Sequence, residues 1–173
     1  MGRPKPFVPV DGVPMARRVA DALLTGGCSE VVAVGGDPDA LAALGLEVVA
    51  DQWPGEGPLG AVTTALDAGR DRRADRVVVA PCDLPFVTGP TIAALLASPG
   101  DVVVAVAERV QPLLSVWTTG LAGHLRTEFE AGERRILSVL DRLPGVVEAV
   151  VAPSDLVNVN GPDDLPHPGG LPQ

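Results

Sequence analysis

Positive charge is scarce in this sequence, and lysine is almost absent from it. Lys5 is the single lysine, and the thirteen basic residues face twenty-two acidic ones, which gives a net charge of −9. The chain also has no tyrosine, whose ring could stack on nucleic-acid bases. Because a protein that binds nucleic acid needs a positive surface, we expect no nucleic-acid partner. Any phosphate group is therefore expected to be held locally, by a metal ion or a few placed cations.

Cysteine and long apolar runs are scarce as well. Cys28 and Cys82 lie far apart and form no CxxC pair, which argues against a disulfide framework and against a structural zinc site. No apolar run approaches the roughly 18 residues of a membrane helix, and the first residues lack the apolar core of a signal peptide. We therefore expect reduced thiols, a cytoplasmic location and no membrane contact.

Short β-branched runs alternate with helical patterns along most of the chain. This alternation predicts an α/β fold, a Rossmann-like three-layer sandwich around a mostly parallel sheet, as one domain over residues 1–165. Residues 166–173, rich in proline and glycine, are expected to form a flexible tail. Asp37 and Thr88 are expected to cap helices. Strands are expected at residues 30–34, which read as buried, and at 47–50, 76–80, 101–107, 113–117 and 146–151, and further helices at 121–131 and over GERRILSVLDRL.

Ligand chemistry in such a fold lies at the carboxyl ends of the strands, which makes the loops after them candidate sites. Asp83 in VVVAPCDLPF directly follows a strand, where its carboxylate could hold Mg²⁺ together with water and substrate phosphate oxygens. An Asx turn is the alternative interpretation of Asp83. The neighbouring Cys82 is interpreted as a small buried hydrophobe rather than a nucleophile.

Three further groups of polar residues could bind a ligand, and each also has a structural interpretation. Asp51 and the backbone of Gly55 to Gly60 could contact a ribose and a base, although a crossover loop is the simpler reading of DQWPGEGPLG. Asn158 and Asn160 could ligate a metal or bind phosphate, or could form a turn. Arg134 and Arg135 could reach an anionic substrate or form a solvated helix face, and no role is assigned to His124 or His167.

Several motifs, in this order, resemble those of the molybdenum cofactor guanylyltransferases. The family signature has the form LAGGxSxRMGxDK followed by LPVxG, and MGRPKPFVPVDG is similar to its second half. PGEGPLG resembles the guanylyl-type loop, PCDLPF the metal-aspartate loop, and NVNGPDDL the closing NVNTPEDL-like motif. QPLLSVW and AGERRI resemble a substrate-side strand and a helix start of the family. The resemblance extends from Met1 to about Leu165.

The resemblance implies a nucleotidyltransferase domain that uses Mg²⁺ and GTP. The terminal phosphate of a molybdopterin-type cofactor would attack the α-phosphorus of GTP, and pyrophosphate would leave. By motif position, Lys5 would neutralise the triphosphate, Asp83 would hold Mg²⁺, and Asn160 would lie close to the metal. Proteins of the molybdenum cofactor pathway are further implied partners. The implied nucleotide-binding residues are Lys5, Asp51, Gly55, Gly57, Pro58, Leu59, Gly60 and Asp83, and the implied substrate-side residues are Gln111, Pro112, Arg134, Arg135 and Asn158.

In the family that this chain resembles, a first strand and a glycine-rich loop precede the Met-Gly pair. We therefore expect a sheet without that strand, with unpaired strand edges. Residues 1–173 alone are expected to bind Mg·GTP weakly or not at all and to transfer no nucleotide. An internally assigned start codon and a truncated, non-catalytic paralogue that acts as a binding module are two interpretations. Cytidylyl transfer to molybdopterin and guanylyl transfer to 2-phospholactate are alternative reactions.

Overall fold

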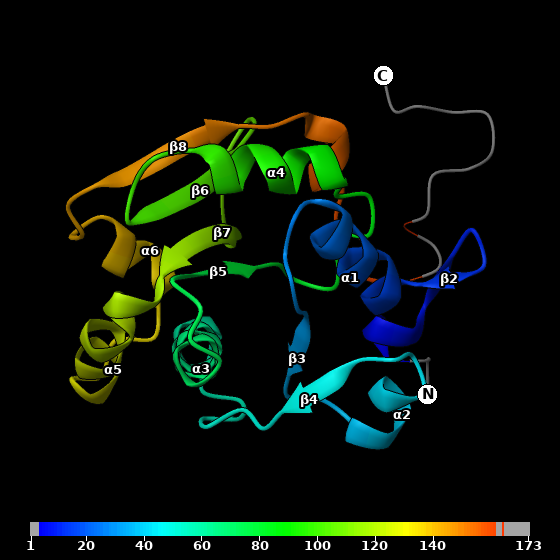
Figure 1. Ribbon diagram of the computed structural model, residues 1–173, viewed down its shortest axis with the longest axis horizontal. Helices are drawn as coiled ribbons and strands as arrows, with labels where there is room; N and C mark the ends of the chain where they lie inside the picture. Colours follow the sequence, from blue (N-terminus) through cyan, green and yellow to red (C-terminus); the bar gives the residue numbers. More distant parts are fainter. Residues whose placement is uncertain (1–3, 162–163, 165–173) are drawn as a thin grey trace.

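The computed structural model describes residues 4–161 and residue 164, and its helices and strands alternate along the chain (Figure 1). The helices are α1 (Met15–Thr25), α2 (Pro38–Ala42), α3 (Pro58–Asp71), α4 (Gly89–Ala97), α5 (Ala122–Glu130) and α6 (Ile136–Leu140), with 3₁₀ helices η1 (Lys5–Phe7), η2 (Thr119–Leu121) and η3 (Pro153–Leu156). The strands are β1 (Pro9–Val10), β2 (Val13–Pro14), β3 (Val32–Val34), β4 (Glu47–Val49), β5 (Arg76–Val79), β6 (Val102–Val106), β7 (Val110–Thr118) and β8 (Val146–Val150).

The strands of the described residues form three separate sheets. The largest has the order β5-β7-β6-β8, the second pairs β3 with β4, and the third is the small hairpin of β1 and β2. β7 runs antiparallel to both β5 and β6, whereas β8 is parallel to β6, so three strands of the largest sheet share one direction. β3 and β4 are also parallel. The predicted α/β class is confirmed, and the predicted sheet is interrupted between β3 and β5.

Local sequence explains where two of the helices begin. The Asp37 side chain accepts the N–H of Ala40 at 3.1 Å and the Thr88 hydroxyl accepts the N–H of Thr91 at 3.4 Å, as predicted. Each helix has proline in its first turn, where a missing N–H costs no helix hydrogen bond. Asp155, which is buried, accepts hydrogen bonds from the hydroxyls of Thr88 and Thr91 and so ties η3 to the start of α4.

The core lies in two main layers on opposite faces of the four-stranded sheet. On one face, side chains of α1 and α4 pack against alternate residues of β6 and β7, among them Val103 and Leu114. On the other, α3, α5 and α6 pack around Trp117, which is fully buried and donates its indole N–H to the Ser115 hydroxyl at 2.8 Å. Figure 1 shows α4 on one side of this sheet and α3 and α5 on the other. This is the expected three-layer arrangement.

Several sequence predictions differ from the structure in extent or burial. The run 30–34, expected as a buried strand, forms a strand only at Val32–Val34; residues 31–34 are half-buried and Glu30 is exposed, and all residues of β5 are half-buried as well. β7 extends beyond the predicted 113–117 because its early residues continue the ladder with β6 past a register shift at Val104/Ala105. The predicted helix over GERRILSVLDRL is limited to α6. The predicted flexible tail, 166–173, lies outside the described residues. None of the described helices has the length and hydropathy needed to cross a membrane.

Gly69 offers a test of how closely α3 packs on β5. A Cβ at this position would lie 2.3 Å from Val77 Cγ2, so the Val77 side chain, the helix or the strand must shift. Gly69→Ala is expected to lower the free energy of unfolding by about 1–3 kcal/mol, the usual cost of overpacking a core. Urea denaturation measures the change.

The matched control is Gly123→Ala in α5, where an added Cβ meets nothing within 4 Å. Because alanine is the better helix former, this variant is expected to be as stable as the parent or more stable, by up to about 1 kcal/mol. Equal effects of the two substitutions would contradict the tight contact between α3 and β5.

Candidate functional site

Three of the residues predicted to act on phosphate and metal lie together, although they come from the start, the middle and the end of the described chain. The Lys5 ammonium donates to Asn160 Oδ1 at 2.5 Å and lies 3.7 Å from Asp83 Oδ2. The Lys5 side chain is 46% exposed and the Asp83 side chain 23% exposed, so both can be reached from solvent. The trio of Lys5, Asp83 and Asn160 thus combines one positive charge, one carboxylate and one amide oxygen at the surface.

Backbone hydrogen bonds and a small buried apolar cluster position the trio. The backbone N–H of Val159 donates to the carbonyl of Asp83 at 2.9 Å, which fixes the C-terminal segment to the loop after β5. Val159 is fully buried and packs against residues of the N-terminal hairpin and the start of α1, among them Val8 and Met15. Asp164 Oδ2 accepts the N–H of Asn160 at 2.7 Å and so orients the turn that carries it. The apolar neighbours therefore bring Lys5 and Asn160 to Asp83.

Arg18 also holds this region together, and the sequence analysis did not identify it. Its guanidinium donates to the carbonyl of Pro85 at 3.0 Å and to that of Val10 at 3.3 Å, and it lies 5.8 Å from the centre of the Phe86 ring. These contacts connect the N-terminal hairpin to the loop that carries Asp83. The only local signal was an arginine pair on an amphipathic helix, which does not reveal distant carbonyl acceptors.

The trio suits a hard cation better than a soft one. Asp83 offers carboxylate oxygens and Asn160 an amide oxygen, the donor atoms that Mg²⁺ prefers. Within residues 4–161 and 164, no three residues of the types His, Cys, Asp and Glu are grouped to form a complete protein cage. Mg²⁺ in nucleotide enzymes needs only one or two carboxylates, because water and phosphate fill the remaining positions. The residues present therefore fit a cation that binds together with a phosphate ligand.

Asp51 mainly organises its own loop. Its Oδ1 accepts the N–H of Trp53 at 3.0 Å and the hydroxyl of Thr64 at 3.3 Å, which is the structural interpretation considered for this residue. Gly55 and Gly57 both have positive φ, at 80° and 98°, so the loop needs glycine at these positions. The loop from Asp51 to Gly57 is half-exposed to exposed throughout. It can present backbone groups to a ligand, whereas the Asp51 side chain is partly occupied.

Two residues of the predicted nucleotide loop belong to the core instead of the surface. Pro58 starts α3, and the Leu59 side chain that follows it is fully buried among the residues under α5. Gly60 is buried as well, and a Cβ there would lie 3.2 Å from both Trp53 Cβ and Phe129 Cε2. The Leu59 side chain therefore anchors the helix, and the nucleotide contact expected of this loop stays a prediction for its backbone. Gly60 allows Trp53 and Phe129 to approach the helix closely.

Arg134, which follows α5, holds the loop from Asp51 to Gly57 through Glu56. Its guanidinium pairs with Glu56 Oε2 at 3.0 Å, donates to the carbonyl of Phe129 at 2.7 Å, and lies 3.9 Å from the centre of the Phe129 ring. These contacts place the Arg134 side chain against the loop, and its expected contact with an anionic substrate stays a prediction. Arg135, next in sequence, has an exposed side chain that can reach solvent.

The other predicted substrate-side residues lie at the same edge of the sheet or on the surface. Val79 at the end of β5 is opposite Ser115 of β7, so the earlier β7 residues Gln111 and Pro112 lie past the carboxyl end of β5. Both are half-buried. Asn158 is exposed and is separated from the trio's Asn160 by the buried Val159. Beyond the trio, the described contacts join none of these residues directly to Lys5 or Asp83.

Comparisons with known proteins agree on one relationship. The family model described as a MobA-like NTP transferase domain matches residues 1–153. The chain is 33% identical over 167 residues to a molybdenum cofactor guanylyltransferase of Cereibacter sphaeroides; the aligned region covers 95% of this chain and 86% of that protein. It is 31% identical over 180 residues to one of Rhizobium meliloti, covering 95% and 83%. The solved molybdopterin-guanine dinucleotide biosynthesis protein A from Archaeoglobus fulgidus matches with a TM-score of 0.68 at 25% identity, covering 92% of this chain and 86% of that one.

Cys82 can report on the charges of the trio. Burial raises the pKa of the Cys82 thiol, the Asp83 carboxylate raises it further, and the Lys5 ammonium lowers it. Asp83→Asn is therefore expected to lower the pKa of Cys82 and speed its alkylation, and Lys5→Gln to raise the pKa and slow alkylation. Each effect is expected to stay within about tenfold, the change in thiolate fraction per pKa unit.

Peptide mapping after iodoacetamide treatment measures the rate at each cysteine. Cys28, whose pKa is raised by burial alone, is the internal control and should react at the same rate in all three proteins. If both substitutions moved the Cys82 rate in the same direction, the described arrangement of Lys5 and Asp83 around the thiol would be wrong.

Proposed function

The chain belongs to the MobA-like NTP transferase family, and from that premise we propose that it transfers a guanylyl group from GTP to a molybdopterin-type cofactor. The observation that carries this proposal is the convergence of Lys5, Asp83 and Asn160 at the carboxyl end of β5. The names of its relatives support the choice of guanylyl group and acceptor. GTP and the cofactor are the proposed substrates, with Mg²⁺ as the metal.

In the proposed reaction, an oxygen of the cofactor's terminal phosphate attacks the α-phosphorus of GTP. A new P–O bond forms, the bond between the α-phosphorus and the bridging oxygen breaks, and pyrophosphate leaves with the bonding electrons. Such transfers are accelerated mainly by positioning and by neutralising phosphate charge, because the protein forms no covalent bond. The chain must therefore supply cationic and hydrogen-bonding groups at the phosphates.

Lys5 is the proposed phosphate-neutralising residue. Its ammonium is a compact charge on a flexible stem, and its two partners at the site, Asn160 and Asp83, leave the side chain almost half exposed. When a triphosphate binds, the ammonium can turn from the Asn160 oxygen toward a phosphate oxygen. The guanidinium of an arginine is larger and planar, so it would not place a compact charge at the position that the Lys5 ammonium takes beside Asn160.

Asp83 and Asn160 are the residues proposed to hold Mg²⁺. A bound Mg²⁺ would neutralise phosphate charge and orient the phosphates. With the metal in place, Lys5 would be free of the Asp83 carboxylate and available to the nucleotide. The existing pair of Lys5 and Asp83 thus keeps the carboxylate neutralised until both ligands arrive.

The remaining predicted residues are assigned by their location. We propose that the backbone around Gly55 and Gly57 contacts the nucleotide, with Asp51 shaping the loop and Arg134 fixing it through Glu56. Pro58 and Gly60 set the start of α3 behind this loop. Gln111, Pro112, Arg135 and Asn158 remain the proposed acceptor side.

Two other transfers would use the same residues, namely cytidylyl transfer to the same cofactor and guanylyl transfer to 2-phospholactate. Pyrophosphate release separates them, with GTP and CTP in competition and each acceptor tested in turn on the natural gene product purified from its host. Release that needs both GTP and the molybdopterin cofactor supports the proposal. Preference for CTP, or for 2-phospholactate, would replace it, and no release with any pair would favour a non-catalytic binding module.

Asp83→Asn tests the metal and phosphate site directly. The amide keeps the shape and removes the charge, so the rate of guanylyl transfer in the natural gene product is expected to fall by about a hundredfold or more. The control is Asp11→Asn, at a side chain that is 83% exposed and forms a long ion pair with Arg18. Asp11 has a positive φ, which asparagine also tolerates, so the Asp11→Asn variant should transfer the guanylyl group at the parent rate. Retention of activity in Asp83→Asn would remove this residue from the mechanism.

Arg134→Ala tests the positioning of the nucleotide loop. Loss of the contacts with Glu56 and Phe129 should loosen the loop and raise the KM for GTP several-fold, with little change in kcat, because Arg134 does not touch the reacting phosphates. Arg70→Ala, at an exposed arginine on α3, is the control and should leave both constants unchanged. A fall in kcat at constant KM would instead indicate that Arg134 acts on the transition state.

A further inference from the structure

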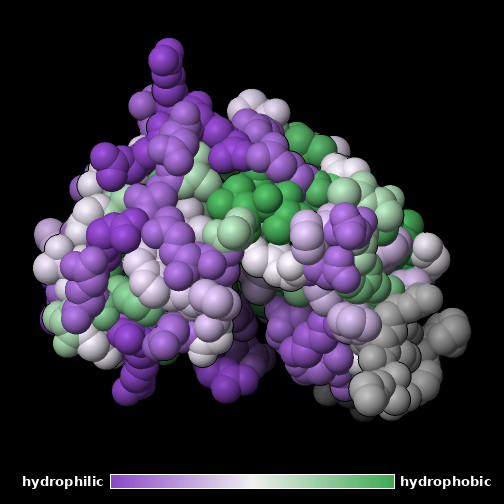
Figure 2. All heavy atoms as spheres, turned by 90° about the horizontal axis from the view of Figure 1, so that it is seen from below, coloured by the Kyte–Doolittle hydropathy of each residue, from purple (hydrophilic) through white to green (hydrophobic). Residues whose placement is uncertain are grey.

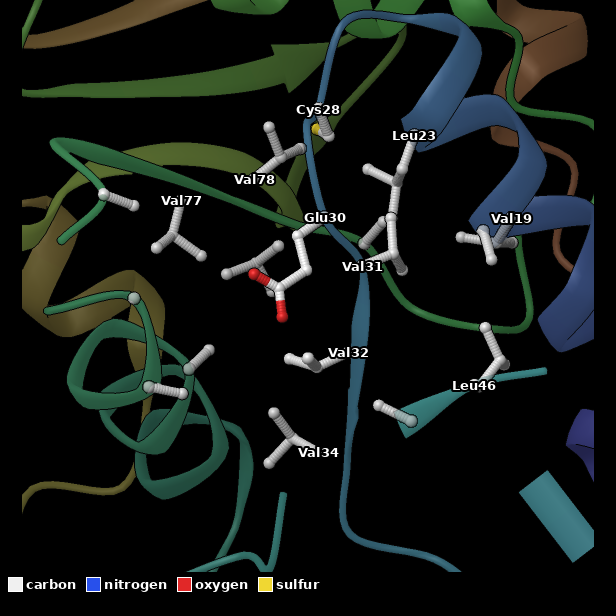
Figure 3. A pocket seen from close by; sticks show the side chains of 18 of the residues that line it. Val19, Leu23, Cys28, Glu30, Val31, Val32, Val34, Leu46, Val77 and Val78 are labelled. Carbon is white, nitrogen blue, oxygen red and sulfur yellow. The ribbon is translucent and has the colours of Figure 1, made fainter. Parts of the chain in front are cut away.

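Among the described residues, a cavity and a buried carboxylate have no part in the proposed reaction. Figure 2, which views the molecule from the side below Figure 1, shows hydrophobic residues exposed in the middle of the face with hydrophilic ones around them. The cavity, of about 760 Å³, lies between β3 and β5, whose side chains line different sides of it (Figure 3). The strand that precedes the Met-Gly pair in the family is expected at this place, so the cavity belongs to the sheet. The carboxylate is that of Asp155.

Asp155 is a buried acidic residue that is held by hydroxyl groups. Its side chain belongs to a residue that is only 7% exposed. Its Oδ2 accepts the hydroxyls of Thr88, at 3.0 Å, and of Thr91, and its Oδ1 accepts that of Ser154 at 3.3 Å. Among residues 4–161 and 164, no arginine, lysine or histidine forms an ion pair with it. Because burying a carboxylate is costly unless its oxygens are paired, the exact placement of these hydroxyls matters to the fold.

Residues 83–88 and residues 155–160 form two segments that are tied together at both ends. At one end, Val159 donates its N–H to the carbonyl of Asp83 at 2.9 Å. At the other end, Asp155 accepts the threonine hydroxyl that closes the first segment. Each contact joins the start of one segment to the end of the other, so these paired segments run antiparallel. In Figure 1, the orange turn of η3 lies at the right-hand end of α4, where the first segment leads into that helix.

Apolar contacts fill the space between the two ends of the paired segments. Leu156 packs against the cluster in which Leu84 and Val87 are buried, and Phe86 packs against the cluster of Val159. Apolar contacts are non-directional, so they hold the segments together without fixing how far one is shifted along the other. Hydrogen bonds are directional, so those at the two ends set this register.

We propose that Asp155 is a positioning residue, which sets the register of the paired segments and thereby holds Asn160 beside Asp83 and Lys5. Asn160 directly follows Val159, and its amide oxygen accepts from the Lys5 ammonium at 2.5 Å. A shift by one residue, roughly 3.3 Å in an extended chain, would take Asn160 out of hydrogen-bond range of Lys5. As far as the metal is concerned, this inference rests on the proposed function, in which Asp83 and Asn160 hold Mg²⁺.

The first measurement needs no ligand, because the N–H of Val159 reports directly whether the paired segments stay joined. Its exchange with solvent deuterium is followed by NMR in the full chain. Asp155→Ala is expected to speed this exchange at least tenfold relative to Gly69→Ala, because the segments then open locally. Gly69→Ala controls for a general loss of stability, since its added Cβ meets Val77 in the other core layer.

The second measurement is the binding of Mn²⁺, in place of Mg²⁺, to the natural gene product in the presence of GTP. Asp155→Ala is expected to raise the dissociation constant of Mn²⁺ by about tenfold, the lower end of the usual effect of groups that orient metal ligands. Ser154→Ala is the matched control, because its hydroxyl reaches Asp155 from within η3 and joins no second segment. This variant should change neither the Mn²⁺ affinity nor the exchange of Val159.

Two further variants separate position from charge, and they decide the question if Asp155→Ala does not fold. Asp155→Asn removes the charge but keeps a group that can bond the threonine hydroxyls, so it should stay close to the parent in both measurements. Thr91→Val removes one hydroxyl and keeps the shape of the side chain. It should shift both measurements as Asp155→Ala does, though by less, and should add nothing to Asp155→Ala in the double variant.

Three results would overturn the inference. One is an exchange rate of Val159 that is the same in Asp155→Ala as in Gly69→Ala, and another is an unchanged Mn²⁺ affinity in Asp155→Ala. The third is an equal effect of Asp155→Asn and Asp155→Ala, because charge rather than position would then be responsible. If the parent protein bound no Mn²⁺ with GTP, the proposed function would fail, whereas the exchange of Val159 would still decide whether Asp155 holds the paired segments.

Discussion

The hydrogen bond from the N–H of Val159 to the carbonyl of Asp83 joins the end of the chain to its centre. It places Asn160 next to the loop after β5, while the buried side chain of Val159 packs on the hairpin that follows Lys5. Arg18 adds a second link between that hairpin and the same loop. The charge of Lys5, the carboxylate of Asp83 and the amide of Asn160 meet because of these contacts. A site that depends on residues so far apart exists only in the folded chain.

The two sides of the proposed active site are built differently. The phosphate side is held by backbone hydrogen bonds and a small apolar cluster, and its functional side chains are partly exposed. The nucleotide side is a glycine-rich loop held in place by Arg134, Phe129 and Trp53. The ring centres of Trp53 and Phe129 lie 4.7 Å apart, and the Arg134 guanidinium lies over the Phe129 ring. The first arrangement leaves charged groups able to turn toward a ligand, whereas the second keeps the backbone in place.

The sequence predicted those features of the fold and of the candidate site that local pattern and the order of motifs determine. Asp83 was proposed because a carboxylate follows an aliphatic strand, and Lys5 and Asn160 because motifs near both termini resemble one family; the structure brings the three together. Arg18 was missed, and the pairing of Arg134 with Glu56 was not foreseen, because tertiary folding brings their acceptors, the carbonyl of Pro85 and the carboxylate of Glu56, to them. The burial of β3 was overestimated because a run of valine and alanine looks the same in an interior strand and at an open edge.

The most direct test of the account is whether Lys5 lies beside a metal-bound nucleotide. Lysine labelled with ¹³C at Cε gives a signal for Lys5 in the natural gene product, which a Lys5→Arg variant identifies, and Mn²⁺ in place of Mg²⁺ broadens signals of nearby nuclei. The account predicts that Mn²⁺ with GTP broadens the Lys5 signal strongly and that Asp83→Asn keeps it sharp. A Lys5 signal that stays sharp at saturating Mn²⁺ and GTP would contradict the central claim that Lys5, Asp83 and Asn160 form one phosphate and metal site.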